Sequence, residues 1–282
     1  MSISKTLHFS VADDVNIAAS SYGYEQNPVV IMLHGAGQTR HSWHRSAKSI
    51  AENGFYVLTL DARGHGESDW SPQQDYAIDT LIDDLRQVLL QVGSAKPAVV
   101  GASLGGITAL LAQGEDNRQL FSLLSLVDIT PSVDMQGVAR ILEFMSRFSD
   151  GFATLDEAAS AIAAYKKTAV DKNRQGLQKN LRRGENGRYY WHWDPALLNH
   201  VGHFGREIMQ RQREAAGRLS LPVLLVHAKM SEIVSDADAK EFLQLVPHAE
   251  YVDVAEATHM LATDSNDAFA STVVEFLNRH HR

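Results

Sequence analysis

Short apolar runs alternate with helical periodicities along this chain, and that alternation constrains its fold more than any other feature. Three such runs are Val29–Leu33, Phe55–Leu60 and Leu123–Val127, and their β-rich composition is typical of strands buried on both faces of a parallel sheet. Between the second and third runs, apolar residues at helical spacing predict an amphipathic helix with Asp79 as its N-cap. The segment Ser2–Tyr22 is expected to add one or two antiparallel edge strands. We therefore predict an α/β fold with a doubly wound, mostly parallel β-sheet.

The alternation stops at Pro131 and resumes at Pro222. The intervening segment shows no strand pattern, whereas apolar spacing between residues 138 and 148 and a capping box at Thr154 indicate helices. We predict that residues 131–215 form a helical cap inserted between two parts of one core, residues 1–130 and 216–282. The second part should contain two more strands, and it should end in a helix from about Asn266.

Composition excludes several classes of protein. The 282 residues are 44% hydrophobic and 21% charged, which suits a folded chain with a sizeable core. The absence of cysteine excludes disulfides and thiolate metal sites, and the net charge of −8 argues against nucleic acid as a partner. No apolar run has the length of a membrane span, and the first residues do not resemble a secretory signal. We expect a cytoplasmic protein that is a monomer or homodimer, acts on a small molecule, and needs no membrane or cofactor.

The pattern Gly101-x-Ser103-x-Gly105 is the strongest functional signal in the chain. An apolar strand candidate precedes it and an apolar helix candidate follows it. A serine on such a tight turn points its hydroxyl out of the sheet, close to the helix N-terminus, where backbone N–H groups favour a developing negative charge. The flanking glycines relieve crowding at the turn. The sequence therefore predicts that Ser103 is a nucleophile.

Several loops together resemble those of the α/β-hydrolase fold family over nearly the whole chain. The matching motifs are His34-Gly35-Ala36-Gly37, Asp61-x-Arg63-Gly64-His65-Gly66-x-Ser68, the Gly-x-Ser-x-Gly turn, and a late histidine, His259. The cap-bearing, serine esterase-like branch of that family is the most similar. The resemblance implies an oxyanion hole formed by the backbone N–H groups of Ala36 and Leu104. His34 and His65 belong to these loops of the family and are expected to be architectural, and we expect no metal site.

A general base must take the proton of the serine hydroxyl, and His259 follows the last predicted strand in the family's order of serine, acid and histidine. The histidine pairs His41/His44 and His200/His203 have ligand-like spacing, but no third ligand lies near them in the sequence.

The acid of the triad is less clearly marked. The family's usual aspartate after the seventh strand is replaced here by Ser231, which cannot supply a full negative charge. Asp128 follows the sixth strand, as in an esterase branch that this pairing resembles, and Glu232 lies one residue beyond the usual position. We favour Asp128 over Glu232, with Asp236 as a further candidate.

The predicted cap is rich in aromatic residues, among them Phe144, Trp191 and Trp193. These side chains could line an apolar substrate pocket, or they could simply pack the cap onto the core. The sequence leaves both interpretations open.

The motifs favour a serine hydrolase that cleaves a carboxylic ester, thioester or lactone through an acyl-enzyme. The same groups could serve a carbon–carbon bond hydrolase or a cofactor-free perhydrolase. A non-catalytic ligand-binding protein of the same fold is a further alternative. A nucleotide-binding enzyme is disfavoured because no Gly-x-Gly-x-x-Gly follows the first parallel strand.

Overall fold

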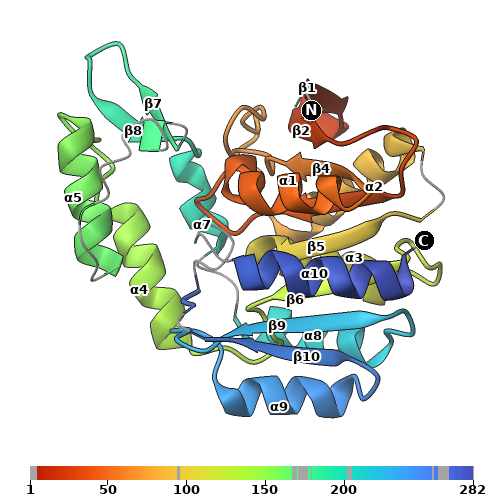
Figure 1. The fold of residues 1–282 in the computed structure, drawn as a ribbon. Coiled ribbons are helices and arrows are strands. Elements are labelled where there is room, and N and C mark those ends of the chain that lie inside the picture. The colour runs from red at the N-terminus through yellow and green to blue at the C-terminus, as the bar shows by residue number, and fades with distance from the viewer. Residues whose placement is uncertain are drawn as a thin grey trace.

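One sheet of eight strands forms the centre of the protein (Figure 1). The computed structural model describes residues 5–93, 96–166, 170, 177–178, 180–201, 205–255, 257–259 and 267–281. The strand order is β1-β2-β4-β3-β5-β6-β9-β10. The first two strands pair antiparallel with their neighbours, and every other pairing is parallel, as predicted. The strands are β1 (Lys5–Ser10), β2 (Asn16–Tyr22), β3 (Val29–Leu33), β4 (Tyr56–Leu60), β5 (Ala98–Ala102), β6 (Leu123–Val127), β9 (Val223–Ala228) and β10 (Glu250–Val254).

Helices cover both faces of the sheet, so its central strands are buried on two sides. Along β3, Val29, Ile31 and Leu33 enter one hydrophobic cluster, while Val30 and Met32 enter the other. This period of two explains the continuous apolar runs in the sequence. One face carries α1 (His44–Glu52) and α10 (Asp267–His280), and the other carries α2 (Ile78–Val92), α3 (Leu104–Gly114), α8 (Arg206–Gly217) and α9 (Asp236–Leu245). Short 3₁₀ turns lie at Ala12–Asp14, Arg40–Trp43 and Pro195–Leu197.

The predicted N-cap of α2 is wrong. The helix begins at Ile78 with Ala77 as its N-cap, and Asp79 lies inside the first turn. The Asp79 carboxylate instead accepts a hydrogen bond from Arg211 of α8 at 2.6 Å. Asp75 fixes the helix start by accepting from the Ala77 N–H at 3.0 Å. Asp79, which the local sequence predicted to be the N-cap, therefore forms a long-range ion pair with Arg211.

The segment after β6 stands apart from the sheet, on the left of Figure 1. It contains α4 (Met135–Ser146), α5 (Leu155–Lys166), β7 (Leu181–Arg183), β8 (Tyr189–Trp191) and α7 (Leu198–Val201). The expectation that this segment holds no strand is wrong, because β7 and β8 form a hairpin. Three residues per strand are too few to show an alternating pattern in the sequence.

The helix α8 contains residue 215, the expected end of the cap, yet it packs against α3 of the core. A Cβ on Gly114 of α3 would collide with the backbone of Ala215, so the two helices approach closely. We use the name cap for residues 131–201, which include the segment that stands apart from the sheet. Two hydrogen bonds join the cap to the loop after β4: the Gly66 N–H donates to the His192 carbonyl at 2.8 Å, and the Asp194 N–H donates to the Gly64 carbonyl at 2.8 Å.

The last histidine of the sequence packs into the interior. His281 is buried, with its ring stacked on Phe55. Its imidazole lies 2.9 Å from the Val29 carbonyl, and burial lowers its pKa.

Among the described helices, none combines the length and the hydrophobicity needed to span a lipid bilayer.

Candidate active site

Ser103 lies on the turn between β5 and α3, and its backbone is strained. Its φ of 48° and ψ of −118° place a non-glycine residue in a region that side chains rarely adopt. The residue immediately precedes the first helical residue, Leu104, so it sits at the positive end of the α3 dipole. This is the geometry that the Gly-x-Ser-x-Gly motif predicts.

The glycines of the motif are required by close backbone contacts. A Cβ on Gly101 would lie 2.6 Å from the Gly105 carbonyl oxygen, and a Cβ on Gly105 would lie 2.6 Å from the Leu33 carbonyl oxygen. Any larger residue would push the turn away from β3, so the glycines hold Ser103 close to the loop that follows that strand.

Asp128 and His259 form a hydrogen-bonded pair beside this turn. Asp128 follows β6, whose Val127 pairs with Ala102 of β5, so the aspartate and Ser103 leave adjacent strands. The His259 Nδ1 lies 2.7 Å from Asp128 Oδ2, and Asp128 is only 1% exposed. Because the carboxylate can only accept, Nδ1 is the protonated nitrogen and Nε2 remains free to accept a proton. The Ser103 hydroxyl itself makes no hydrogen bond within the described part of the chain.

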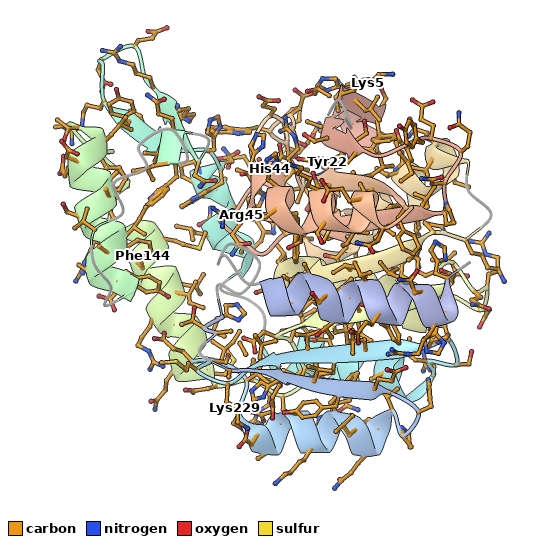
Figure 2. All side chains as sticks on the ribbon, viewed as in Figure 1. Lys5, Tyr22, His44, Arg45, Phe144 and Lys229 are labelled. Atoms are coloured by element: carbon orange, nitrogen blue, oxygen red, sulfur yellow. The ribbon has the colours of Figure 1, made fainter. Side chains whose placement is uncertain are left out.

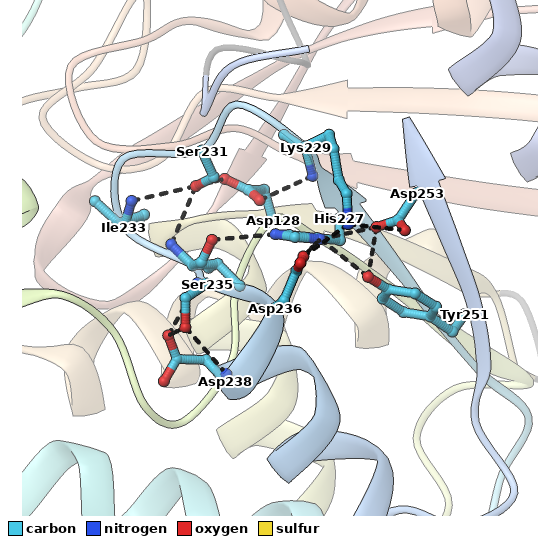
Figure 3. A network of polar contacts seen from close by, with 12 residues as sticks. Asp128, His227, Lys229, Ser231, Ile233, Ser235, Asp236, Asp238, Tyr251 and Asp253 are labelled. Carbon is cyan, nitrogen blue, oxygen red and sulfur yellow. Dashed lines mark hydrogen bonds and ion pairs between the residues drawn. The ribbon is translucent and has the colours of Figure 1, made fainter. Parts of the chain in front are cut away.

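Ser231 stands where the family's usual aspartate would be, and it supports Asp128 (Figure 3). Its hydroxyl donates to Asp128 Oδ2 at 2.6 Å and accepts from the N–H groups of Ile233 and Val234 at 3.2 and 3.1 Å. The Ala228 N–H donates to the other carboxylate oxygen at 3.0 Å. Three donors therefore satisfy the buried carboxylate and fix its orientation.

The two alternative acids lie elsewhere. Glu232 is exposed and lies close enough to Tyr165 of α5 to affect its pKa. The pKa of Tyr165 is raised first by the burial of its own hydroxyl and then by the negative charge of Glu232. Asp236 accepts a hydrogen bond from Lys229 at 2.8 Å. The structure thus brings Asp128, and neither Glu232 nor Asp236, into contact with His259.

Two backbone amides beside Ser103 have no acceptor among the described residues. They belong to Ala36 and Leu104, the pair that the resemblance implied. The amides around them are used: Gly37 donates to His65 Nε2 at 3.1 Å, and Gly105 donates to the His34 carbonyl at 3.1 Å. Two unsatisfied donors next to a serine hydroxyl can hold a negatively charged oxygen.

His34 and His65 hold the loop that carries one of these amides. His34 Nδ1 donates to the Gly35 carbonyl at 2.8 Å, and its Nε2 accepts from the Ala62 N–H at 3.0 Å. Burial lowers the pKa of His34, and burial together with the neighbouring His34 lowers the pKa of His65 to about 3. Both rings are therefore neutral near pH 7, as their accepting Nε2 atoms require, and both act on the backbone.

A largely apolar pocket opens at Ser103. Its walls come from the loop after β3, the start of α3, the residues after β6, and the helices α4 and α8. The apolar spacing between residues 138 and 148 predicted a helix, but sequence reasoning did not assign that helix or the α8 residues to a pocket. The lining residues are Ala36, Ser103, Leu104, Ile107, Ile129, Val133, Met135, Val138, Ile141, Leu142, Met145, Met209, Gln212 and Ile233.

The three aromatic residues proposed for the pocket are not among its lining residues. Phe144 stacks on Tyr165 of α5, with ring centroids 4.2 Å apart, and lies on the cap in Figure 2. Trp191 packs edge-on against Phe152, and Trp193 is buried in a small cluster where the cap meets the core. In this structure their contacts are those of a packed cap.

One group of side chains has the spacing of a metal site. The ligand atoms of His227, Asp236 and Asp253 lie within 4.8 Å of one another (Figure 3). The Lys229 ammonium also contacts both carboxylates, at 2.8 and 3.3 Å, and supplies the positive charge that this cluster needs. In each of the two histidine pairs noted in the sequence, one member contacts a tyrosine. His44 contacts the Tyr22 hydroxyl, His200 lies edge-on to Tyr76, and His203 lies outside the described residues.

Comparisons with known proteins bear on the fold and the family of the chain. A family model described as alpha/beta hydrolase fold matches residues 28–265. Esterase Rv0045c of Mycobacterium tuberculosis is 31% identical over 258 residues, covering 87% of this chain and 81% of that protein. A crystal structure of the same esterase aligns at 27% identity with a TM-score of 0.77, over 98% of this chain and 92% of that one.

More distant proteins share the fold. A diacylglycerol lipase of Danio rerio, named sn-1-specific, is 28% identical over 94% of this chain and 84% of its own length. The crystal structure of E-2-(acetamidomethylene)succinate hydrolase has a TM-score of 0.86 at 19% identity, covering 98% of this chain and 100% of that one.

Proposed function

The chain belongs to the alpha/beta hydrolase fold family, and from this premise we propose that it is a serine hydrolase that cleaves a carboxylic ester, thioester or lactone. The observation that carries the proposal is the pair of unpartnered amides, Ala36 and Leu104, beside the Ser103 hydroxyl in one pocket. Donors left unsatisfied at such a point suit a site whose acceptor arrives with the substrate. The esterase and lipase names of the relatives support the same class of reaction.

The proposed reaction proceeds through an acyl-enzyme. His259 Nε2 takes the hydroxyl proton as Ser103 Oγ attacks the carbonyl carbon, and the carbonyl oxygen becomes an oxyanion held by the two amides. The tetrahedral intermediate collapses as His259 returns the proton to the leaving alcohol or thiol. Water then attacks the acyl-enzyme by the same route and releases the acid and free Ser103.

Asp128 is the proposed third member of the triad. Its hydrogen bond to His259 Nδ1 selects the tautomer whose Nε2 accepts the serine proton, and its charge stabilises the imidazolium that forms. The missing bond between the Ser103 hydroxyl and a described residue is compatible with this role, because catalytic hydrogen bonds tighten when substrate binds.

The pocket supports a substrate with a hydrocarbon chain. Three methionines, Met135, Met145 and Met209, line it together with branched aliphatic residues. Methionine side chains are flexible and fit apolar groups of varied shape. We therefore propose that one side of the scissile bond carries an aliphatic group of moderate length.

Hydrolysis of p-nitrophenyl acetate, butanoate and hexanoate tests the proposal. We expect measurable turnover by the intact protein and a loss of at least about 10³-fold in Ser103→Ala, because the acyl-enzyme cannot form without the hydroxyl. Thermal denaturation of the variant controls for folding. Turnover in folded Ser103→Ala above about a tenth of wild type would remove Ser103 as the nucleophile.

A further inference from the structure

Gln212 is an anomaly in the wall of the pocket. It is one of the residues that line the pocket together with Ser103, and its side chain is only 4% exposed. Its Oε1 is buried and has no hydrogen-bond partner among the residues that the structure describes. Buried polar atoms are almost always paired in folded proteins, so an unpaired amide oxygen on a residue that lines a pocket needs an explanation.

The helix that carries Gln212 is rigidly held, so the orientation of the side chain is not accidental. On one side, Arg211 pairs with Asp79 of α2 and with Glu115 after α3, at 2.6 and 2.9 Å. On the other, Arg213 donates to the Ser132 hydroxyl at 2.9 Å and forms an ion pair with Glu241 of α9. Because the side chains of Arg211 and Arg213 are held on either side of the helix by these contacts, Gln212 faces the interior of the protein.

The position of Gln212 along α8 is one where an apolar residue would be expected. The inward face of the helix consists of Ile208, Met209, Ala215 and Ala216, and Gln212 falls on the same face at helical spacing. Leucine or methionine would satisfy packing there without leaving a polar atom unpaired. The amide is therefore better explained by a ligand than by the fold.

We propose that Gln212 is a specificity-determining residue whose Oε1 accepts a hydrogen bond from a donor, such as a hydroxyl group, on the substrate chain that occupies this pocket. The inference rests on the proposed hydrolase function and narrows its substrate class. The natural substrate would carry an aliphatic chain with a hydroxyl or amide N–H along it, rather than a plain hydrocarbon chain. A site built around such a bond discriminates against analogues that lack the donor, because the protein group is then left unpaired.

Matched pairs of esters test this inference. Hydroxyl groups are placed on the acyl side (p-nitrophenyl 3-hydroxy- and 6-hydroxyhexanoate against hexanoate) or on the alcohol side (6-hydroxyhexyl acetate against hexyl acetate). The readout is the ratio of kcat/KM for the hydroxylated ester to that for its plain partner. We expect wild type to favour the hydroxylated member of at least one pair, and Gln212→Leu to lower that ratio about tenfold.

Gln210→Leu is the matched control, since it makes the same change on the exposed face of the same helix, where Gln210 donates to Glu214. Its ratios should equal those of wild type. Gln212→Met, which has a similar length, serves as the second variant if the leucine variant does not fold. Ratios that stay within about twofold of wild type in the Gln212 variants would overturn the proposal. A bound water would then be the hydrogen-bond partner of the Gln212 amide oxygen.

A separate arm distinguishes failure of the inference from failure of the proposed function. If wild type hydrolyses none of the esters, the hydrolase assignment fails, and binding of hexane-1,6-diol and hexan-1-ol is then measured by calorimetry. Preference for the diol in wild type that is lost in Gln212→Leu supports the site without any catalysis. Equal binding of the two alcohols, or an unchanged preference, refutes it.

Discussion

At the scale of single residues, two adjacent strand ends share an unusual backbone. Ser103 has a φ of 48° and Asp128 a φ of 49°, both in the left-handed region that favours glycine. Such conformations cost about 1–3 kcal/mol each and persist where the surroundings fix them. Here the strain aims the serine hydroxyl out of the sheet and the aspartate toward His259, so it lies on the residues to which we assign chemistry.

Replacement of the two candidate acids should have very different effects. Asp128→Asn should lower kcat by about 10³–10⁴-fold, because the amide no longer favours the tautomer that leaves Nε2 free. Glu232→Gln removes the same charge from an exposed side chain, and it should change kcat by less than about twofold. Steady-state hydrolysis of p-nitrophenyl butanoate measures both variants.

The Glu232→Gln variant is the matched control for Asp128→Asn. A large loss in Glu232→Gln, with Asp128→Asn close to wild type, would transfer the role of the acid to Glu232. Circular dichroism of both variants separates lost chemistry from lost folding, since Asp128 also accepts bonds from Ala228 and Ser231.

The sequence marked Ser103 and favoured Asp128 as the acid, but it left Glu232 open as an alternative. Local patterns identify the ends of strands, where functional residues of a parallel sheet gather. The distance from each carboxylate to His259 depends on how β6, β9 and the loop after β10 lie beside one another. That arrangement is tertiary, and a single residue of offset between Ser231 and Glu232 turns one side chain inward and the other toward the cap.

At the scale of elements, two neutral histidines brace the loop after β3. The rings of His34 and His65 lie 5.0 Å apart, and each accepts a backbone N–H through Nε2. Protonation of either Nε2 would remove that acceptor and place a charge in the interior. The loop with the Ala36 amide therefore depends on both rings staying neutral.

This dependence predicts how stability changes with pH. Burial lowers the pKa of His65 from 6.5 to about 3, so between these values the unfolded chain binds more protons than the folded protein. The contribution is complete above about pH 6.5 and is lost as the pH falls toward 3. Urea denaturation should show a free energy of unfolding lower by about 1.5 kcal/mol at pH 5.0 than at pH 6.5 from His65 alone.

His65→Asn should remove the His65 part of that pH dependence and leave the part due to the other buried histidines, His34 and His281. His8→Asn, on an exposed position of β1, should leave the dependence unchanged. Equal slopes in wild type and His65→Asn over the range of pH 5.0 to 6.5 would show that His65 is not held neutral by the fold. The range lies above the ordinary pKa values of carboxylates, which keeps their titration out of the comparison.

The elements of the core were more predictable than those of the cap, for a physical reason. The runs Val29–Leu33 and Leu123–Val127 match β3 and β6 because burial on two faces demands apolar residues throughout. The hairpin of β7 and β8 has only three residues per strand and is stabilised by contacts such as Phe152 with Tyr189. The local sequence of the hairpin does not indicate which distant residues it contacts.

At the scale of the whole molecule, the cap is joined to the core by a buried polar contact. The Tyr76 hydroxyl, from the loop before α2, donates to Asp194 of the cap at 2.5 Å and accepts from the Ser71 N–H at 2.9 Å. Burial and the Asp194 carboxylate raise the pKa of Tyr76, which keeps the hydroxyl protonated as a donor. The contact links segments that lie 118 residues apart in sequence.

Tyr76→Phe should loosen the cap without altering Ser103. Loss of the donor to a buried carboxylate costs about 1–3 kcal/mol, so local unfolding of the cap should become more frequent. We expect trypsin to cleave within residues 135–201 about tenfold faster in the variant. Tyr24→Phe is the matched control, since Tyr24 is 71% exposed. Equal cleavage rates in wild type and Tyr76→Phe would show that the hydrogen bond between Tyr76 and Asp194 does not stabilise the cap.

An activated Ser103 should react covalently with a reagent that modifies nucleophilic serines. The folded protein is treated with a fluorophosphonate, and intact mass, peptide mapping and hydrolysis of p-nitrophenyl butanoate are followed together. We predict a single adduct on Ser103, formed in parallel with the loss of hydrolysis. The absence of an adduct in folded protein, or an adduct on another serine while hydrolysis continues, would contradict the account.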